Sequence, residues 1–181
     1  NGGVMTRLWG VYLPFVDFYF NGPAPTDTQF DTYIITQRWD GFADFPIYPI
    51  MLPSVANAVL GFFYVHEEYA DVTLAPDPEK YQVAEYGDTT YYLIPTETLP
   101  LLMPVAQVPI LGPVAADTLD PVARVLVEAG YNRTVSPGKP TTARFTYFPN
   151  PLKLGANLIV AVPTGVDNGL SDVTGTRPLG T

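Results

Sequence analysis

The feature that most constrains this chain is a strand-like segment that ends in an aspartate, followed by a helix-like segment and then by the chain's single histidine. Residues 32–39 are rich in β-branched and aromatic side chains, which predicts a strand ending at Asp40-Gly41. Because its apolar residues are contiguous rather than alternating, we expect this strand to be buried on both faces. A strand followed by a helix favours an α/β fold.

The helix is predicted from Ser54, which follows Pro53 and is a natural N-cap residue. After it, apolar residues recur at the three- and four-residue spacing of one helix face, at Val55, Ala58, Val59, Phe62 and Phe63. His66 then falls at the end of this helix or just beyond it.

His66 and an aspartate are the candidate catalytic residues. Imidazole is the commonest general base, and it needs a carboxylate on its second ring nitrogen to fix the tautomer. Asp40 lies at the carboxyl end of the predicted strand, where α/β folds collect catalytic groups, and the intervening helix can return His66 to that end. We therefore predict Asp40 as the acid and His66 as the base. Asp44 is the alternative acid, whose other role would be to cap a turn.

Composition excludes several classes of function. The chain has 181 residues with a net charge of −9, which argues against nucleic acid and against electrostatic attachment to anionic lipid. It has no cysteine and one histidine, so disulfides, a thiol nucleophile and a typical zinc site are not expected. We expect neither a cofactor nor a metal. Twenty prolines and fifteen glycines predict short elements joined by many loops in a single domain.

Residues 95–113 form an apolar segment broken by five prolines, which rule out a continuous transmembrane helix there. Two interpretations remain open. The segment is an irregular apolar strap packed on the core, or it is a cap that binds acyl chains over an active site. In the second case Leu101, Leu102 and Met103 are the candidate substrate-binding residues.

Other elements are predicted from turn and cap residues. Residues 7–20 suggest an aromatic loop leading into a strand, and residues 81–94 a hairpin turning at Gly87-Asp88. A helix is expected from Asp120 as N-cap, with Pro121 in its first turn, to Gly130. A last helix would start at Asn150-Pro151. We assign residues 1–166 to one domain and residues 167–181 to a flexible tail.

The sequence contains no Gly-x-Ser-x-Gly nucleophile elbow. Its three serines are poor candidates: Ser54 suggests a helix cap, Ser136 lies in a turn, and Ser171 follows the predicted base in the chain. The chain starts at Asn1 rather than at a methionine, and it is expected to be a processed or excised piece, an artificial boundary being the alternative. A nucleophilic serine is expected upstream.

Four strings carry a resemblance to a known family: residues 21–28, residues 40–46, residues 64–69 and residues 87–96, the last followed by Leu99-Pro100-Leu101-Leu102. They resemble the C-terminal part of the mycobacterial PE-PPE domain, over about residues 1–165. The resemblance implies an α/β-hydrolase of the serine esterase type, related to cutinases and lipases, in which some members act as acyltransferases on trehalose-based envelope lipids. It also implies that Asp40 and His66 are acid and base, that the serine elbow lies upstream, and that the protein is secreted or in the cell envelope.

Together these observations predict the C-terminal portion of an α/β-hydrolase, a parallel sheet flanked by helices with a Pro-rich apolar cap and a hairpin. It would be the acid–base half of a serine esterase, lipase or acyltransferase for lipid or glycolipid acyl esters, inactive by itself. Its partner would be the missing N-terminal half or another protein. The alternative is a non-catalytic structural or binding subunit that associates through apolar surface.

Overall fold

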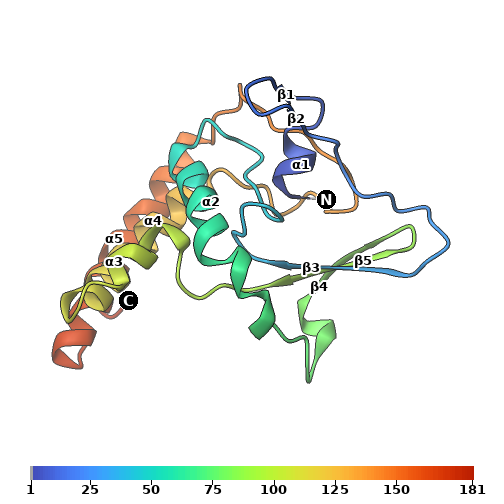
Figure 1. The fold of residues 1–181 in the computed structure, drawn as a ribbon. Coiled ribbons are helices and arrows are strands. Elements are labelled where there is room, and N and C mark those ends of the chain that lie inside the picture. The colour runs from blue at the N-terminus through green and yellow to red at the C-terminus, as the bar shows by residue number, and fades with distance from the viewer. Residues whose placement is uncertain (1) are drawn as a thin grey trace.

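A computed structural model describes residues 2–181, and it contains a three-stranded mixed sheet with helices beside it (Figure 1). Strand β3 (Thr32–Gln37) pairs in parallel with β5 (Thr89–Ile94), and β5 pairs antiparallel with β4 (Gln82–Tyr86). The strand order is β3-β5-β4. The predicted α/β class and the hairpin at residues 81–94 are confirmed, while the parallel part of this sheet is a single pair.

Strand β3 lies at an edge of this sheet, and the expected burial on both faces is wrong. Tyr33 is 63% exposed and Ile35 is 39% exposed, whereas Gln37 is buried. Successive strand residues point to opposite faces, so Tyr33, Ile35 and Gln37 share one face, which is exposed at Tyr33 and Ile35 and becomes buried at Gln37 at the end of the strand. Contiguous apolar residues do not distinguish a covered strand from one with an open face.

Helix α2 (Leu52–Tyr64) follows β3, and the chain then continues into the 3₁₀ helices η1 (His66–Asp71) and η2 (Pro78–Tyr81). The helix begins three residues earlier than predicted, with Met51 as its N-cap and with Pro53 tolerated in its first turn. Ser54 is therefore not an N-cap. Its side chain is buried, and its hydroxyl donates to the Val127 carbonyl at 2.6 Å.

The proline-rich segment is more helical than predicted. It contains the 3₁₀ helix η3 (Pro100–Leu102), the short helix α3 (Met103–Ala106) and the start of α4 (Leu111–Glu128). The helix expected after an N-cap at Asp120 thus begins ten residues earlier, with Ile110 as its N-cap, and Pro121 lies inside it. An interior proline removes one backbone hydrogen bond and crowds the preceding turn, yet α4 continues through Pro121.

Helix α5 (Pro151–Thr174) lies along α4 (Figure 1). Its predicted start is confirmed: Asn150 accepts hydrogen bonds from the backbone of Leu152 and Lys153. The expected boundary of a flexible tail at Asp167 differs from the structure, since α5 continues to Thr174. Asp167 is buried and accepts hydrogen bonds from the backbone N–H groups of Leu179 and Thr181, so it fastens the last residues against the helix.

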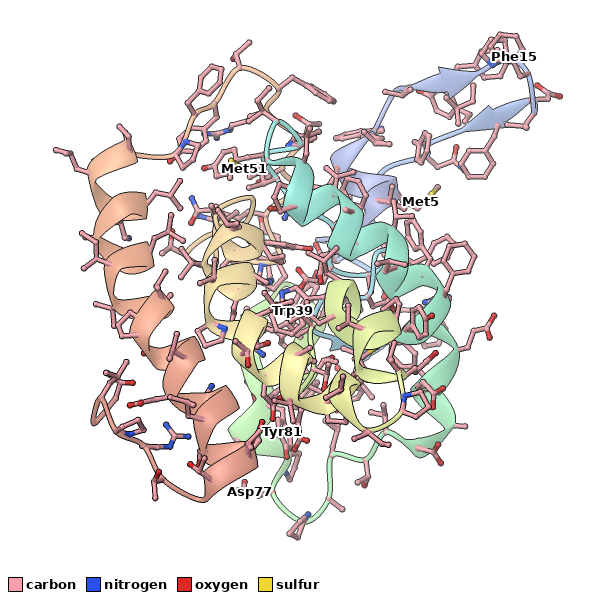
Figure 2. All side chains as sticks on the ribbon, turned by 90° about the vertical axis from the view of Figure 1, so that its left-hand side faces the viewer. Met5, Phe15, Trp39, Met51, Asp77 and Tyr81 are labelled. Carbon is pink, nitrogen blue, oxygen red and sulfur yellow. The ribbon has the colours of Figure 1, made fainter. Side chains whose placement is uncertain are left out.

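The N-terminal region contains helix α1 (Val4–Arg7) and a small antiparallel hairpin of β1 (Tyr12–Leu13) and β2 (Phe18–Tyr19). This hairpin replaces the loop and strand predicted for residues 7–20. Figure 2 shows it projecting from the body of the molecule with Phe15 at its tip, where that side chain is 98% exposed.

The core has two clusters. One surrounds Trp39, which is fully buried near the centre of the view in Figure 2, and the other surrounds Phe45 and Ala58. Both clusters contact the segment that follows β3, so this segment is anchored on two sides. In residues 2–181, helices long and apolar enough to cross a membrane are absent.

Candidate active site

His66 and Asp40 lie in direct contact. Nδ1 of His66 is 2.9 Å from Oδ2 of Asp40, although 26 residues separate them in the chain. Asp40 is completely buried, while the side chain of His66 is 44% exposed. The structure therefore brings together the two residues that the strand–helix–histidine order predicted to meet.

Close backbone packing places His66 at the end of β3. Helix α2 crosses the Trp39–Gly41 segment so tightly that a Cβ on Gly61 would lie 2.0 Å from the Trp39 carbonyl oxygen. A Cβ on Gly41 would likewise lie 2.2 Å from the carbonyl oxygen of Ala58. Only glycine permits this approach at both positions. Trp39 adopts a positive φ of 65°, which turns the chain at the strand end just before Asp40.

Neutral donors complete the surroundings of Asp40. The Tyr69 hydroxyl donates to Oδ2 at 2.7 Å, and the Phe42 backbone N–H donates to Oδ1 at 2.8 Å. The same Tyr69 oxygen accepts a hydrogen bond from the Gln37 backbone N–H at 3.0 Å. A buried carboxylate is tolerated when its oxygens are hydrogen-bonded, and here both oxygens are. Sequence reasoning missed Tyr69, although its place three residues after His66 was a usable signal.

Asp44 is held in a different network. Its carboxylate accepts two hydrogen bonds from Nη1 of Arg133, at 2.7 and 2.8 Å, and one from the backbone N–H of Trp39 at 2.9 Å. Burial alone would lower the pKa of Arg133, but Asp44 and then Glu128 outweigh burial and raise it. The guanidinium is thus a permanent cation paired with Asp44. The structure places Asp40, not the alternative Asp44, against His66.

Aromatic rings surround the imidazole. The ring of Phe42 lies 4.4 Å from that of His66, and Tyr69 meets it edge-on at 5.9 Å between centroids. Among residues 2–181 no hydrogen-bond partner contacts Nε2, the ring nitrogen that faces away from Asp40. In chemical terms this is an oriented imidazole with one nitrogen engaged by a carboxylate and the other available to a proton donor.

The serines do not complete this arrangement. Ser54 is buried in the core, and Ser136 accepts a hydrogen bond from the Gly138 N–H in a turn. Ser171 lies near the end of α5. Within the part of the chain that the structure describes, His66 forms no hydrogen bond to any of them.

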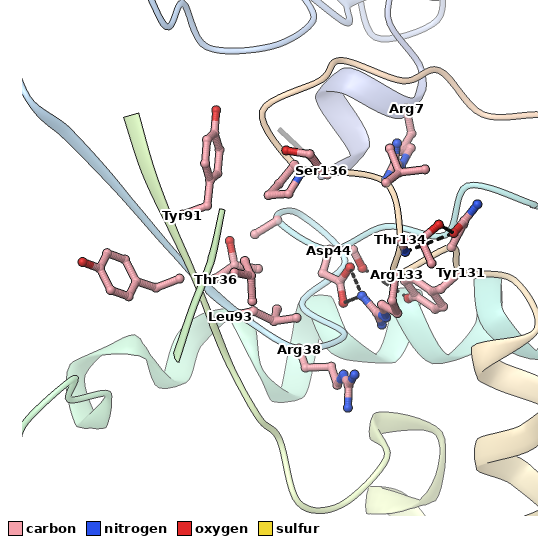
Figure 3. Close-up of a pocket in the computed structure, with 17 residues that line it drawn as sticks. Arg7, Thr36, Arg38, Asp44, Tyr91, Leu93, Tyr131, Arg133, Thr134 and Ser136 are labelled. Carbon is pink, nitrogen blue, oxygen red and sulfur yellow. Dashed lines mark hydrogen bonds and ion pairs between the residues drawn. The ribbon is translucent and has the colours of Figure 1, made fainter. Parts of the chain in front are cut away.

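A cavity of about 400 Å³ lies beside the sheet, and Figure 3 shows its wall. The Asp44–Arg133 pair, Arg38 and Tyr91 are among its lining residues, whereas Asp40 and His66 are not. This cavity is therefore separate from the His66–Asp40 pair. In the described chain, clusters of three or more His, Cys, Asp or Glu side chains that could hold a metal ion are absent.

The residues expected to bind acyl chains occupy different environments. Leu102 is 5% exposed and belongs to the Trp39 cluster, so it packs in the core and does not form a surface wall. Leu101 is partly buried against the same cluster, and Met103 is partly exposed at the start of α3. Because η3 is a helical turn, the side chain of Leu102 points toward the Trp39 cluster and not toward the surface.

Comparison with known proteins identifies the family. Residues 1–132 match the family model of the PE-PPE domain. The chain belongs to the PE-PPE domain family. It is 36% identical over 177 residues to the PE family protein PE3 of Mycobacterium tuberculosis, covering 96% of this chain and 37% of that protein. It is 40% identical over 152 residues to the esterase PE16 of the same organism, covering 79% of this chain and 27% of that protein.

A third relative of this PE-PPE chain is the diacyltrehalose acyltransferase Chp2 of Mycobacterium tuberculosis, 31% identical over 125 residues. The match covers 67% of this chain and 34% of Chp2. The chain thus spans about a quarter to somewhat over a third of the length of these relatives. No solved structure matches it significantly. The predicted resemblance to the mycobacterial PE-PPE domain is confirmed.

Proposed function

We propose that this PE-PPE chain supplies the acid, Asp40, and the base, His66, of a serine-type esterase, lipase or acyltransferase. Its fold would be the C-terminal portion of an α/β-hydrolase, with the nucleophilic serine outside residues 1–181. The observation that carries the proposal is the 2.9 Å contact between Nδ1 of His66 and the buried Asp40 carboxylate, with Nε2 left available. This is the arrangement that a serine requires for activation.

The relatives support this class of reaction. One is named an esterase and another a diacyltrehalose acyltransferase, and both names describe chemistry on acyl esters. For this chain we propose acyl esters of lipids or glycolipids as substrates. The phenyl ring of Phe42, 49% exposed beside His66, suits an acyl chain better than a charged group. We place the protein in the cell envelope or outside the cell.

In the proposed reaction, Nε2 of His66 accepts the proton of the serine hydroxyl as its oxygen attacks the ester carbonyl carbon. Asp40 stabilises the imidazolium that forms. The imidazolium then gives the proton to the departing alkoxide, which leaves an acyl-serine and a neutral imidazole. Water or a sugar hydroxyl, deprotonated in turn by Nε2, attacks the acyl-serine, and the imidazolium returns this proton to the departing serine oxygen. The acyl group leaves as a carboxylic acid or a new ester, and the serine is regenerated.

The test uses the protein in which this chain is joined to its Gly-x-Ser-x-Gly segment, assayed with a short acyl ester. His66→Ala and Asp40→Asn should each lower kcat by about 10³–10⁴-fold. Glu67→Gln, beside His66 but exposed, is the matched control and should keep the wild-type rate. Wild-type turnover by His66→Ala would refute the proposal.

Two further comparisons make the test specific. Asp44→Asn should retain far more activity than Asp40→Asn, and the reverse result would make Asp44 the acid. A fluorophosphonate probe should label the protein that contains the elbow but not residues 1–181 alone. Labelling of the 181-residue chain would show that the nucleophile is within it.

The open face of β3 favours a second candidate function, a non-catalytic binding subunit. Tyr33 and Ile35 present apolar surface at a sheet edge, where another strand or protein can dock. In that case the His66 and Asp40 variants would leave the biological activity of the protein unchanged while variants at Tyr33 would abolish partner binding.

A further inference from the structure

Tyr69 bridges the strand end and the candidate acid. Its hydroxyl oxygen accepts from the Gln37 backbone N–H at 3.0 Å and donates to Oδ2 of Asp40 at 2.7 Å. Oδ2 is also the oxygen in contact with Nδ1 of His66. The same carboxylate oxygen therefore contacts both the phenol hydroxyl and the imidazole nitrogen.

Asp40 depends on such donors because it has no paired cation in the described chain. The nearby guanidinium of Arg133 is occupied by Asp44 and Glu128. Asp40 is completely buried, and burying a polar group is costly unless its oxygens are hydrogen-bonded. The Phe42 N–H fixes Oδ1 alone, which leaves the carboxylate free to tilt about that bond. The Tyr69 hydroxyl supplies the second fixed point.

The 3₁₀ helix η1 explains how Tyr69 reaches this place. Residues three apart lie on the same side of a 3₁₀ helix, so His66 and Tyr69 project together toward Asp40. Their rings meet edge-on at 5.9 Å between centroids. Burial, with a further contribution from Asp40, raises the pKa of Tyr69, so its hydroxyl stays a donor throughout the pH range of an assay.

We propose that Tyr69 is a positioning residue: its hydroxyl, held by the Gln37 N–H, fixes the Asp40 carboxylate so that the neutral imidazole of His66 keeps its proton on Nδ1 and presents a bare Nε2. This tautomer of His66 is expected whether or not the proposed reaction takes place. Its consequence for turnover rests on the function proposed above.

The tautomer can be observed directly. His66 is the only histidine of the chain, so histidine labelled with ¹⁵N gives imidazole signals from this ring alone. At a pH where the ring is neutral, the wild type should show the tautomer protonated on Nδ1. Tyr69→Phe should shift the signals toward the tautomer protonated on Nε2, which predominates in free histidine. A wild-type ring protonated mainly on Nε2 would overturn the proposal without any variant.

Tyr64→Phe is the matched control, because the Tyr64 hydroxyl makes no hydrogen bond among residues 2–181 and Tyr64 comes directly before the core residue Val65. It should leave the His66 signals as in the wild type. An unchanged tautomer in a folded Tyr69→Phe protein would overturn the proposal. If Tyr69→Phe does not fold, a wild-type imidazole protonated mainly on Nε2 still overturns the proposal.

Kinetics then separates positioning from general stability. In the protein that contains the serine elbow, Tyr69→Phe should lower kcat roughly 10–100-fold with KM nearly unchanged, because only the orientation of the base is disturbed. Tyr64→Phe should change neither constant. A wild-type kcat in Tyr69→Phe would overturn the catalytic consequence. Failure of the proposed function would appear separately, as wild-type turnover by His66→Ala.

Discussion

At the scale of single residues, Asp40 and Asp44 lie four positions apart and have unlike surroundings. Asp40 is held by a phenol, a backbone N–H and an imidazole, whereas Asp44 is paired with Arg133. Position at the strand end correctly favoured Asp40 as the neighbour of His66, and its catalytic role stays a prediction. Nothing in the local sequence indicated Arg133, which comes from a loop 89 residues away from Asp44.

The ion pair predicts a stability difference. Asp44→Asn should lower the free energy of unfolding by about 2–3 kcal/mol, since it leaves the Arg133 guanidinium with a weaker acceptor in a largely buried place. Asp120→Asn, which removes the more exposed i,i+4 pair with Arg124, should cost only about 0.5 kcal/mol. Urea denaturation of both variants measures the two values. Equal losses would contradict the assignment of Asp44 to a structural ion pair.

At the scale of elements, local signals located the hairpin of β4 and β5 and the start of α5, because turn and cap chemistry is encoded by neighbouring residues. They misplaced the start of α4 and the end of α5. Pro121 resembles a helix start but lies inside α4, and Asp167 resembles a tail residue but is buried. In both cases the packing of α4 against α5 outweighs local preference.

Two glycines of α5 test that packing with the same substitution. A Cβ on Gly165 would lie 2.2 Å from the Thr118 carbonyl oxygen of α4, whereas a Cβ on Gly155 would have no atom within 4 Å. Gly165→Ala should therefore destabilise the protein by about 1–3 kcal/mol through forced separation of the helices. Gly155→Ala should stabilise it by about 0.5–1 kcal/mol through helix propensity. Thermal unfolding followed by circular dichroism should give shifts of opposite sign, and shifts of the same sign would refute this helix contact.

At the scale of the whole molecule, Glu128 joins parts that are distant in the chain. At the end of α4 it accepts a hydrogen bond from Nε1 of Trp39 at 2.8 Å and pairs with Arg133 at 3.1 Å. Burial tends to raise the pKa of Glu128, but Arg133 and then Trp39 outweigh it and lower the pKa below the ordinary value of 4.5. The ionised form is thus favoured by the fold.

This shift predicts how stability depends on pH. A carboxyl whose pKa is lowered on folding adds stability above its unfolded value of 4.5, and that stability is lost as pH falls through the lower folded value. Relative to Glu128→Gln, the wild type should have a constant excess in the free energy of unfolding near neutral pH, and this excess should shrink as pH falls below 4.5. Urea denaturation across this range measures it. An advantage that grows with acidification would contradict the network.

The sequence by itself determined the order strand, aspartate, helix and histidine, the hairpin, and the family, because these depend on neighbouring residues and on short strings that resemble the family. Tertiary structure alone decided that β3 has an open face, that Leu102 belongs to the core, and that Tyr69 contacts Asp40. The physical reason is that each of these depends on which distant segment packs there. Backbone contact at Gly41 and Gly61, not local propensity, sets His66 against Asp40.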